Sequence, residues 1–279
     1  MSEQGATLND LLSGNIPLRS NQSLMEPLLR DGHDFVSVAL SGQVVPGQGF
    51  LRAFMDVVIG LNSAKLDLMV GDLGPSSGSM WRLASLLRDR YEAWRCTIAL
   101  TASPGSSLVA LGADELEMSP AACLTASLTT EPGQADPRMV ARRALESRLD
   151  VEADTKRIDR VLGEIEAAAA GHLPLTPRDC EGRLGLTVVR PDAARWKAIE
   201  ALHEYYREMM AVEGDLTVEG QRFAVTYDGF IDAPGSRRVL LRIVRTDERG
   251  KPVAGRPSLN RWITPHGGEL VLGKELTIG

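Results

Sequence analysis

The sequence predicts an α/β protein with a parallel β-sheet at its centre. Short apolar runs of strand length alternate with longer segments whose apolar residues recur at helical spacing. The strand-length runs are apolar throughout rather than alternating, which favours parallel strands covered by helices on both faces. With 279 residues, 43% of them hydrophobic and 24% charged, the chain is long enough to bury a full core.

The first half of the predicted core alternates strands and helices. In the first helical segment Phe50, Phe54 and Val58 fall on one face, and in the second Leu83 and Leu87 do the same. A Gly/Pro/Ser loop separates the second strand from the second helix. The strands are expected at residues 34–40, 66–70 and 96–100. The helices are expected within residues 49–64, where about three turns carry the apolar spacing, and at residues 80–88.

The second half is more helical and ends in a β-rich region. Residues 137–170 predict one bent helix or two, and Thr176 is expected to cap a short helix with Pro177 in its first turn, followed by a short strand. A further helix at 191–210 places Trp196 on its buried stripe. From about residue 214 the pattern changes to strands and turns. We therefore expect a lead-in at 1–32, a core domain at 33–210 and a small β subdomain at 211–279.

The composition argues against several classes of partner. The formal net charge of −6 disfavours nucleic acid. The three cysteines lie far apart without the spacing of a metal site or a disulfide framework, so neither a metal nor a cofactor is expected. The N-terminal residues lack the pattern of a secretory signal, and no apolar run reaches the roughly 18 residues of a membrane span. A cytoplasmic protein without a membrane partner is the expectation.

The segment at 98–120 carries the strongest functional signal. An apolar strand runs into the turn Ser-Pro-Gly-Ser-Ser and then into a helix of small residues, an arrangement by which several folds present a nucleophilic serine. Pro104 opposes that interpretation, because it has no backbone N–H at a place where an acyl-transfer enzyme needs one. The serines of the turn can equally serve as the N-cap and first turn of the helix.

Three segments together resemble a known family. They are LDLMVGDLGPSSGSMWRLASLLRDR, TASPGSSLVALGADELEMSPAACL and AGHLPLTPRDCEGRLGLTV. In order and spacing they are similar to the serine dehydrogenase proteinase family, which is grouped with the Clp protease and signal-peptide peptidase A in the Clp/crotonase fold. The resemblance covers roughly residues 30–190, and it implies that fold for the core.

The resemblance implies a serine nucleophile and two backbone N–H groups that hold the oxyanion. The family's own spacing places Pro104 at the nucleophile, which leaves none. The spacing of the Clp protease makes Ser103 the nucleophile and puts Gly105 on a family glycine, but Pro104 then stands where a donor is required. For the other donor, an ungapped alignment selects Gly74 and Pro75.

A gapped alignment of the same stretch selects Ser77 and Gly78 instead, which would keep that donor. The base is equally uncertain in the resemblance. His172 lies where the family also has histidine, whereas Leu128 occupies the family's aspartate position. Lys65 or Lys156 could in principle form a Ser–Lys dyad with Ser103.

Three functions follow from these residues. We expect a catalytically inactive member of this group, which acts as a binding or assembly module. The alternative is a serine hydrolase, a peptidase or esterase, in which Ser103 acts with His172 as base. An acyl-CoA enzyme of the crotonase branch is the third. The resemblance also implies a homo-oligomer, and a protein or peptide is the expected partner.

The β-rich tail adds a stripe of basic residues at near-strand spacing. A solvated strand face is the simplest interpretation, and docking against another subunit is the second. The stripe consists of Arg237, Arg238, Arg242, Arg245 and Arg249.

Overall fold

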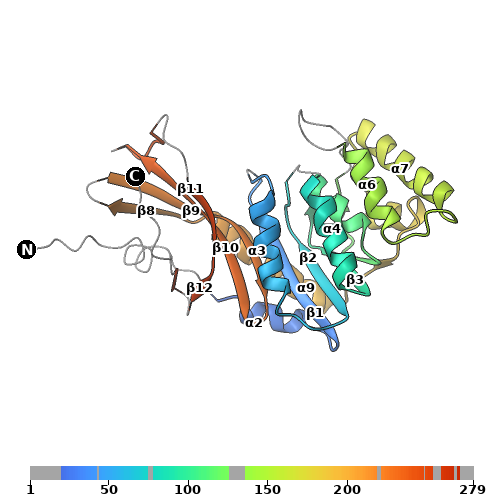
Figure 1. Cartoon of the computed structure of the whole chain (residues 1–279), viewed down its shortest axis with the longest axis horizontal. Coiled ribbons are helices and arrows are strands. Elements are labelled where there is room, and N and C mark those ends of the chain that lie inside the picture. Colours follow the sequence, from blue (N-terminus) through green and yellow to red (C-terminus); the bar gives the residue numbers. More distant parts are fainter. Residues whose placement is uncertain are drawn as a thin grey trace, which may run out of the picture.

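The predicted α/β class is confirmed by a large mixed sheet flanked by helices (Figure 1). The structure is a computed structural model, and it describes residues 20–42, 44–74, 78–125, 136–218, 221–247, 249–253, 259–266 and 269–270. Within these ranges the main sheet has nine strands, in the order β11-β10-β9-β1-β2-β3-β5-β7, with β8 paired to β9.

The parallel half of this sheet contains the predicted strands in the predicted order. All neighbouring pairs in it are parallel. The third strand begins earlier than the pattern suggested, at Ala93 instead of residue 96. The strands are β1 (His33–Leu40), β2 (Lys65–Val70), β3 (Ala93–Ile98), β5 (Glu115–Met118) and β7 (Val188–Val189).

The antiparallel half comes from the β-rich tail and continues the same sheet. β9 pairs antiparallel with β1, with Leu40 opposite Gly229. The predicted core and the predicted β subdomain therefore contribute strands to one sheet, whose far strands project beyond the helical part (Figure 1). These strands are β8 (Glu213–Val218), β9 (Gln221–Ala233), β10 (Ser236–Thr246) and β11 (Leu259–Ile263).

Two short helices and two small strand pairs complete the described part of the fold. The helices lie in the described part of the lead-in, and the last two strands pair antiparallel with each other. The elements are α2 (Gln22–Met25), the 3₁₀ helix η1 (Glu26–Leu28), β4 (Thr101–Ala102), β6 (Cys123–Leu124), β12 (Pro265–His266) and β13 (Glu269–Leu270).

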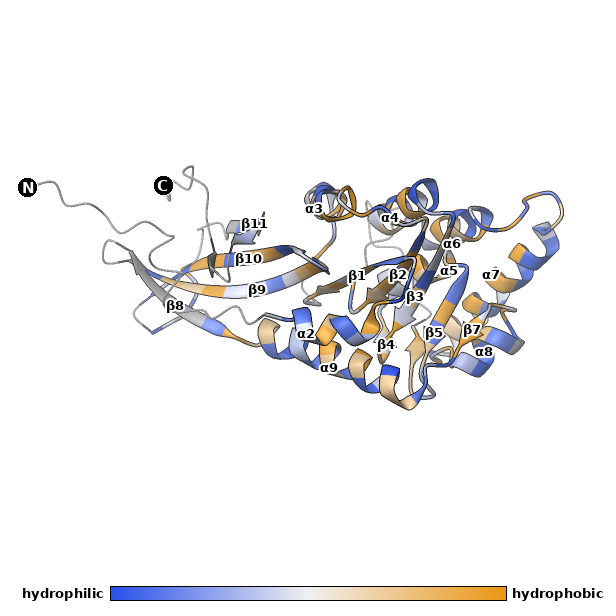
Figure 2. Ribbon diagram, turned by 90° about the horizontal axis from the view of Figure 1, so that it is seen from below, coloured by the Kyte–Doolittle hydropathy of each residue, from blue (hydrophilic) through white to orange (hydrophobic). Residues whose placement is uncertain are grey.

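Helices cover both faces of the sheet, with a hydrophobic cluster on each side (Figure 2). One face packs against the helices of the core, and residues 137–170 form two of these helices. The other face packs against α2 and a long helix that follows β7. The helices are α3 (Gln48–Val58), α4 (Gly78–Arg90), α5 (Pro104–Leu111), α6 (Pro137–Glu146), α7 (Thr155–Ala170), α8 (Pro177–Gly182) and α9 (Ala193–Met210).

Two local predictions for the later helices have different outcomes. Thr176 caps α8 as predicted: its hydroxyl accepts from the Asp179 N–H, and the Asp179 carboxylate accepts from the Thr176 N–H, which completes a capping box. Trp196 was expected to be buried on α9, but it is only partly buried. The rest of the stripe predicted with it is buried, namely Ile199, Leu202, Tyr206 and Met209.

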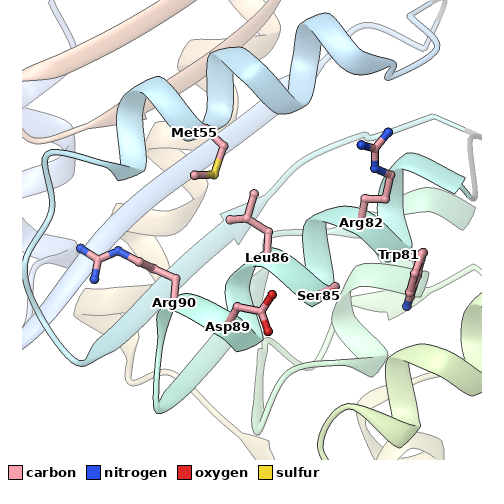
Figure 3. Close-up of a pocket in the computed structure, with 7 residues that line it drawn as sticks. All are labelled: Met55, Trp81, Arg82, Ser85, Leu86, Asp89 and Arg90. Carbon is pink, nitrogen blue, oxygen red and sulfur yellow. The ribbon is translucent and has the colours of Figure 1, made fainter.

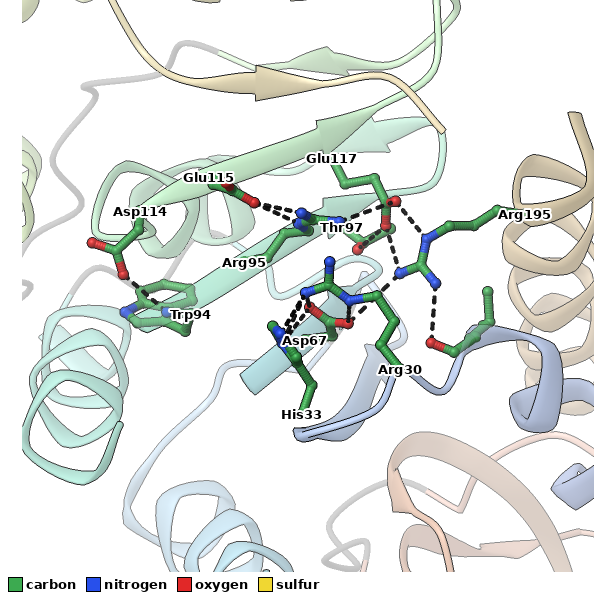
Figure 4. A network of polar contacts seen from close by, with 11 residues as sticks. Arg30, His33, Asp67, Trp94, Arg95, Thr97, Asp114, Glu115, Glu117 and Arg195 are labelled. Atoms are coloured by element: carbon green, nitrogen blue, oxygen red, sulfur yellow. Dashed lines mark hydrogen bonds and ion pairs between the residues drawn. The ribbon is translucent and has the colours of Figure 1, made fainter. Parts of the chain in front are cut away.

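The strands are not apolar on both faces, which corrects the sequence-based expectation. The face that packs against α9 carries Asp67, Thr97 and Glu117, all of them buried. Arg195 of α9 donates to Glu117 (Nη2 to Oε2, 2.9 Å), and Thr97 donates to the same carboxylate at 2.8 Å. Arg30 donates to Asp67 at 2.7 Å (Figure 4). These ion pairs attach α9 and the segment before β1 to the sheet.

The basic stripe of the tail is also largely paired within the chain. Arg237 donates to the fully buried Asp232 (Nε to Oδ1, 2.9 Å), and the Arg242 Nε lies 3.0 Å from the buried Asp228 carboxylate. Arg238 lies 3.5 Å from Asp56 of α3. A purely solvated strand face is therefore wrong for these three arginines.

We expect Glu117→Ala to lower the free energy of unfolding by about 3–5 kcal/mol, because it removes the buried carboxylate to which the Arg195 guanidinium donates. Urea denaturation followed by circular dichroism measures this. Glu181→Ala is the matched control, since it removes an ion pair with Arg190 in which both side chains are exposed. That control should change the midpoint very little; equal losses for the two variants would contradict the role assigned to Glu117.

Candidate functional site

Ser103 lies at the N-cap of α5, in the turn that follows β3 and β4. Its backbone is extended (φ −61°, ψ 169°), and its hydroxyl accepts from the Ser106 N–H at 3.4 Å. Pro104 occupies the first helical position, where proline needs no hydrogen-bond partner and its fixed φ suits the helix. The residues of this turn therefore form a standard capped helix start.

The Ser103 hydroxyl is engaged by structural groups on every side. It accepts from the Leu73 N–H at 3.0 Å, and it lies 3.0 Å from the Ser106 Oγ and 3.5 Å from the Gly74 carbonyl oxygen. Within the described ranges, no histidine, lysine or carboxylate forms a hydrogen bond with it. A serine hydroxyl attacks a carbonyl efficiently when a base accepts its proton, and among the described residues no such base contacts Ser103.

The backbone N–H of Gly74 has an internal acceptor. Gly74 adopts φ +65°, and a Cβ there would lie 2.8 Å from the Val44 carbonyl oxygen, which explains the glycine. Its N–H donates to Asp72 Oδ1 at 2.7 Å. The Gly74 N–H is therefore paired with a carboxylate oxygen inside its own turn.

The N–H of Gly105 is also used within the turn, donating to the Gly74 carbonyl oxygen at 2.8 Å. A Cβ at Gly105 would lie 2.5 Å from that oxygen and 2.9 Å from the Leu73 carbonyl oxygen. The close contact between the two turns therefore requires glycine at 105. Ser106 is fully buried and donates to the Gly71 carbonyl oxygen at 2.6 Å, which ties the turns together a second time.

Several residues of the predicted site lie next to, or outside, the residues that the structure describes. Gly78 is the first residue of α4. Pro75 belongs to the ungapped alignment of the other oxyanion donor, and Ser77 belongs to the gapped one. Both residues lie outside the described residues, as does Leu128. The roles of Ser103, Gly105, Gly74 and Gly78 in catalysis therefore stay predictions.

The proposed bases are not brought to Ser103 by any hydrogen bond. His172 is exposed just after the end of α7, with φ +52°, and its N–H donates to the Ala169 carbonyl oxygen. Lys65 begins β2, at the amino-terminal edge of the sheet, whereas Ser103 follows the carboxyl-terminal edge. Lys156 is exposed on the first turn of α7.

Asp72 is the residue that the sequence analysis missed. Its position two residues before Gly74 is a recognisable signal, because an aspartate side chain often accepts the N–H two residues on and a glycine then allows the left-handed turn. Read in this way, the Asp-Leu-Gly segment predicts an occupied N–H at Gly74.

Other hollows lie away from this turn. One of them, of about 560 Å³, lies between α3 and α4 and is lined by Met55, Trp81 and Leu86 among others (Figure 3). Over the described part of the chain, no group of three or more histidine, cysteine, aspartate or glutamate side chains is arranged to hold a metal ion. Nor does any helix in that part have the length and apolarity needed to cross a membrane.

No family model matches the sequence, and no curated protein does. Among solved structures, the chain is similar to a monofunctional enoyl CoA isomerase from M. smegmatis, at 11% identity over 56% of this chain and 69% of that chain, with a TM-score of 0.38. It is also similar to the 1510-N membrane-bound stomatin-specific protease.

A serine-to-alanine variant of that protease matches at 12% identity over 67% of this chain and 88% of that chain, with a TM-score of 0.38. A lysine-to-alanine variant in complex with a substrate peptide matches at 13% identity over 67% and 84%, with a TM-score of 0.39. Similarities at this level assign the chain to neither group.

We expect Gly105→Ala to destabilise the protein by about 1–3 kcal/mol, because the added methyl group would overlap two carbonyl oxygens of the neighbouring turn. Gly163→Ala in α7 is the control, since a Cβ there meets nothing within 4 Å. It should stabilise by about 0.5–1 kcal/mol through helix propensity. Thermal or urea unfolding compares the two; a neutral Gly105→Ala would contradict the close approach of the turns.

Proposed function

We propose that this protein is a catalytically inactive, serine-peptidase-like protein of the Clp/crotonase fold that acts as a binding or assembly module. One observation carries the proposal: all four hydrogen-bonding neighbours of the Ser103 Oγ belong to the two turns themselves. The hydroxyl therefore caps α5 and holds the Leu73 turn in place, in contact with no base among the described residues.

The electrostatics of the turn support the same proposal. Pro104 has no N–H to donate, and the N–H of Gly74 faces the Asp72 carboxylate. Removal of a single oxyanion donor typically lowers the rate by about 10²–10³-fold. A turn in which one donor is missing and another is paired with a carboxylate would bind a developing oxyanion poorly.

The hydrogen bonds of the Ser103 hydroxyl and of the Gly74 and Gly105 N–H groups also suit a protein that binds a partner without catalysing a reaction. They fix the Ser103 turn against the Gly74 turn at the carboxyl-terminal edge of the sheet, which is the edge where open α/β sheets bind ligands. A protein or peptide partner and a homo-oligomer remain part of the proposal, as does a cytoplasmic setting.

We expect the purified protein to remain unlabelled by a fluorophosphonate serine probe under conditions that label an active serine hydrolase run alongside. Ser103→Ala is treated in parallel, and intact-mass spectrometry reads the adduct. Stoichiometric labelling of the parent protein that disappears in Ser103→Ala would overturn the proposal and favour the hydrolase. Label that persists in the variant would lie elsewhere and leave Ser103 unreactive.

A second measurement tests the structural role assigned to the same hydroxyl. Ser103→Ala should lower the free energy of unfolding by about 0.5–2 kcal/mol, the usual cost of losing an N-cap side chain. Ser103→Thr should recover most of that loss, because it keeps a capping hydroxyl. Urea denaturation of the parent and the two variants measures these free energies. An unchanged free energy of unfolding in Ser103→Ala would contradict the capping role of the hydroxyl.

A further inference from the structure

Arginine side chains gather at the amino-terminal edge of the parallel strands, where the neighbouring strands β5 and β7 begin. Arg148 lies in the turn that joins α6 to α7, at the end of the molecule away from the antiparallel strands (Figure 1). It donates to the Ala113 carbonyl oxygen, which precedes β5, at 2.5 Å. Arg157 of α7 donates to the Gly185 carbonyl oxygen, which precedes β7, at 2.7 Å. Both guanidinium groups therefore lie at the edge opposite to the Ser103 turn.

Gly185 leaves a space beside two arginines of α7. It adopts φ +63°, and the position that a Cβ would take there lies 3.3 Å from Arg160 Nη2 and 3.9 Å from Arg157 Nη2. Arg157 and Arg160 are three residues apart on the helix, so they project from the same side of it. An acceptor oxygen bound beside Gly185 would therefore meet guanidinium nitrogens from both side chains.

The guanidinium groups of Arg148 and Arg160 keep donors for which the described part of the chain offers no acceptor. Arg160 is exposed, and across that part it has neither a hydrogen bond nor an ion pair. Arg148 is partly buried, and the Ala113 carbonyl oxygen is its one hydrogen-bond acceptor there. Because a guanidinium carries five N–H donors, most of those of Arg148 stay available for a ligand.

Other arginines near this edge are already paired with carboxylates. Arg88 donates to Asp114 (Nη2 to Oδ1, 3.1 Å), and Arg183 donates to Glu164 (Nη2 to Oε2, 2.6 Å). Even so, the Nε of Arg88 is buried without an acceptor among the described residues. Hydrogen-bond donors are thus in excess at this edge.

The positive charge of the three remaining arginines is only partly neutralised. Asp154 lies beside Arg157, with 4.0 Å between its Oδ1 and the Arg157 Nη1, while Arg148 and Arg160 have no carboxylate at ion-pair distance among the described residues. Burial lowers the pKa of Arg148 and the Arg157 charge lowers it further, whereas the Asp114 charge raises it. Three guanidinium groups against one carboxylate leave two positive charges that an anion would neutralise.

The geometry points to a binding site for a dianionic phosphate group, held by Arg148, Arg157 and Arg160 beside Gly185. Arginine suits this ligand, because its planar fork donates parallel hydrogen bonds to two phosphate oxygens. Free phosphate and a small phosphate monoester present the same oxygens to these arginines. The site shares no residue with the Ser103 turn, so it goes beyond the proposed function and does not depend on it.

The test titrates inorganic phosphate, phenyl phosphate and acetate separately into the full-length protein by calorimetry at low ionic strength. The pH is held at about 7.5, where a phosphate monoester, with a second pKa of about 6, is a dianion. We expect a Kd on the order of 0.1–1 mM for at least one of the two phosphates, and a Kd about tenfold higher for acetate. The phosphate with the lower Kd identifies the ligand as the free ion or the monoester. Absence of binding by both phosphates at about 10 mM, or equal affinity for acetate, would overturn the proposal.

Two substitutions at α7 locate the site and have effects of opposite sign. Arg160→Gln removes an exposed guanidinium without an internal partner in the described chain, and it should raise the phosphate Kd about tenfold. Asp154→Asn removes the carboxylate beside Arg157, and it should lower the Kd about threefold. The Asp154 side chain makes no capping hydrogen bond to α7, so the helix start should persist in this variant.

Arg82→Gln is the matched control, because Arg82 of α4 is also exposed and, among the described residues, also has no partner. It should bind phosphate with the parent Kd, and circular dichroism should show that all three variants are folded. An unchanged Kd in Arg160→Gln, an equal loss of affinity in Arg82→Gln, or weaker binding by Asp154→Asn would each contradict the assignment.

Discussion

Two carboxylates buried in the parallel strands, those of Asp67 and Glu117, govern what can lie on that face of the sheet. A buried charge must be neutralised and hydrogen-bonded. The guanidinium groups that donate to these carboxylates come from outside the sheet, from Arg30 before β1 and Arg195 on α9, while Arg95 of β3 lies 3.7 Å from Glu117. The segment before β1 and the helix after β7 are therefore held to one face by charge as much as by apolar burial. In the antiparallel half, the buried Asp228 carboxylate is also paired with a guanidinium, that of Arg242.

The order of strands and helices could be predicted because each depends on a local pattern. The helical spacing of Phe50 and Phe54 and the capping signal at Thr176 needed no distant partner. The polar face of the sheet could not be predicted, because a window around Asp67 shows only an apolar run and the arginines that make its burial tolerable lie far away in sequence. The pairing of β9 with β1 likewise joins segments that lie far apart in the sequence. The sequence showed only that the β-rich region differs in pattern from the core, so we expected a separate subdomain there.

The candidate site also combines a local feature that the sequence predicts with a long-range contact that it does not. The Ser-Pro-Gly turn indicated a helix start, and the capping geometry of Ser103 follows from that local signal. The contact that decides the state of its hydroxyl, with the Leu73 N–H, comes from a turn thirty residues earlier and was beyond sequence reasoning. The role of Asp72 could have been predicted, because an aspartate two residues before a glycine is typical of a turn in which the carboxylate accepts the glycine N–H.

The pairing of β9 with β1 determines whether an edge of the parallel sheet is exposed. Strand β1 is an interior strand only because β9 covers one of its edges, from Ser37 to Leu40. A core that ended at residue 210 would present that edge with unpaired N–H and C=O groups, which is the kind of surface that recruits strands from other molecules. The β-rich region thus covers an edge that the parallel strands would otherwise leave open to pairing with another chain.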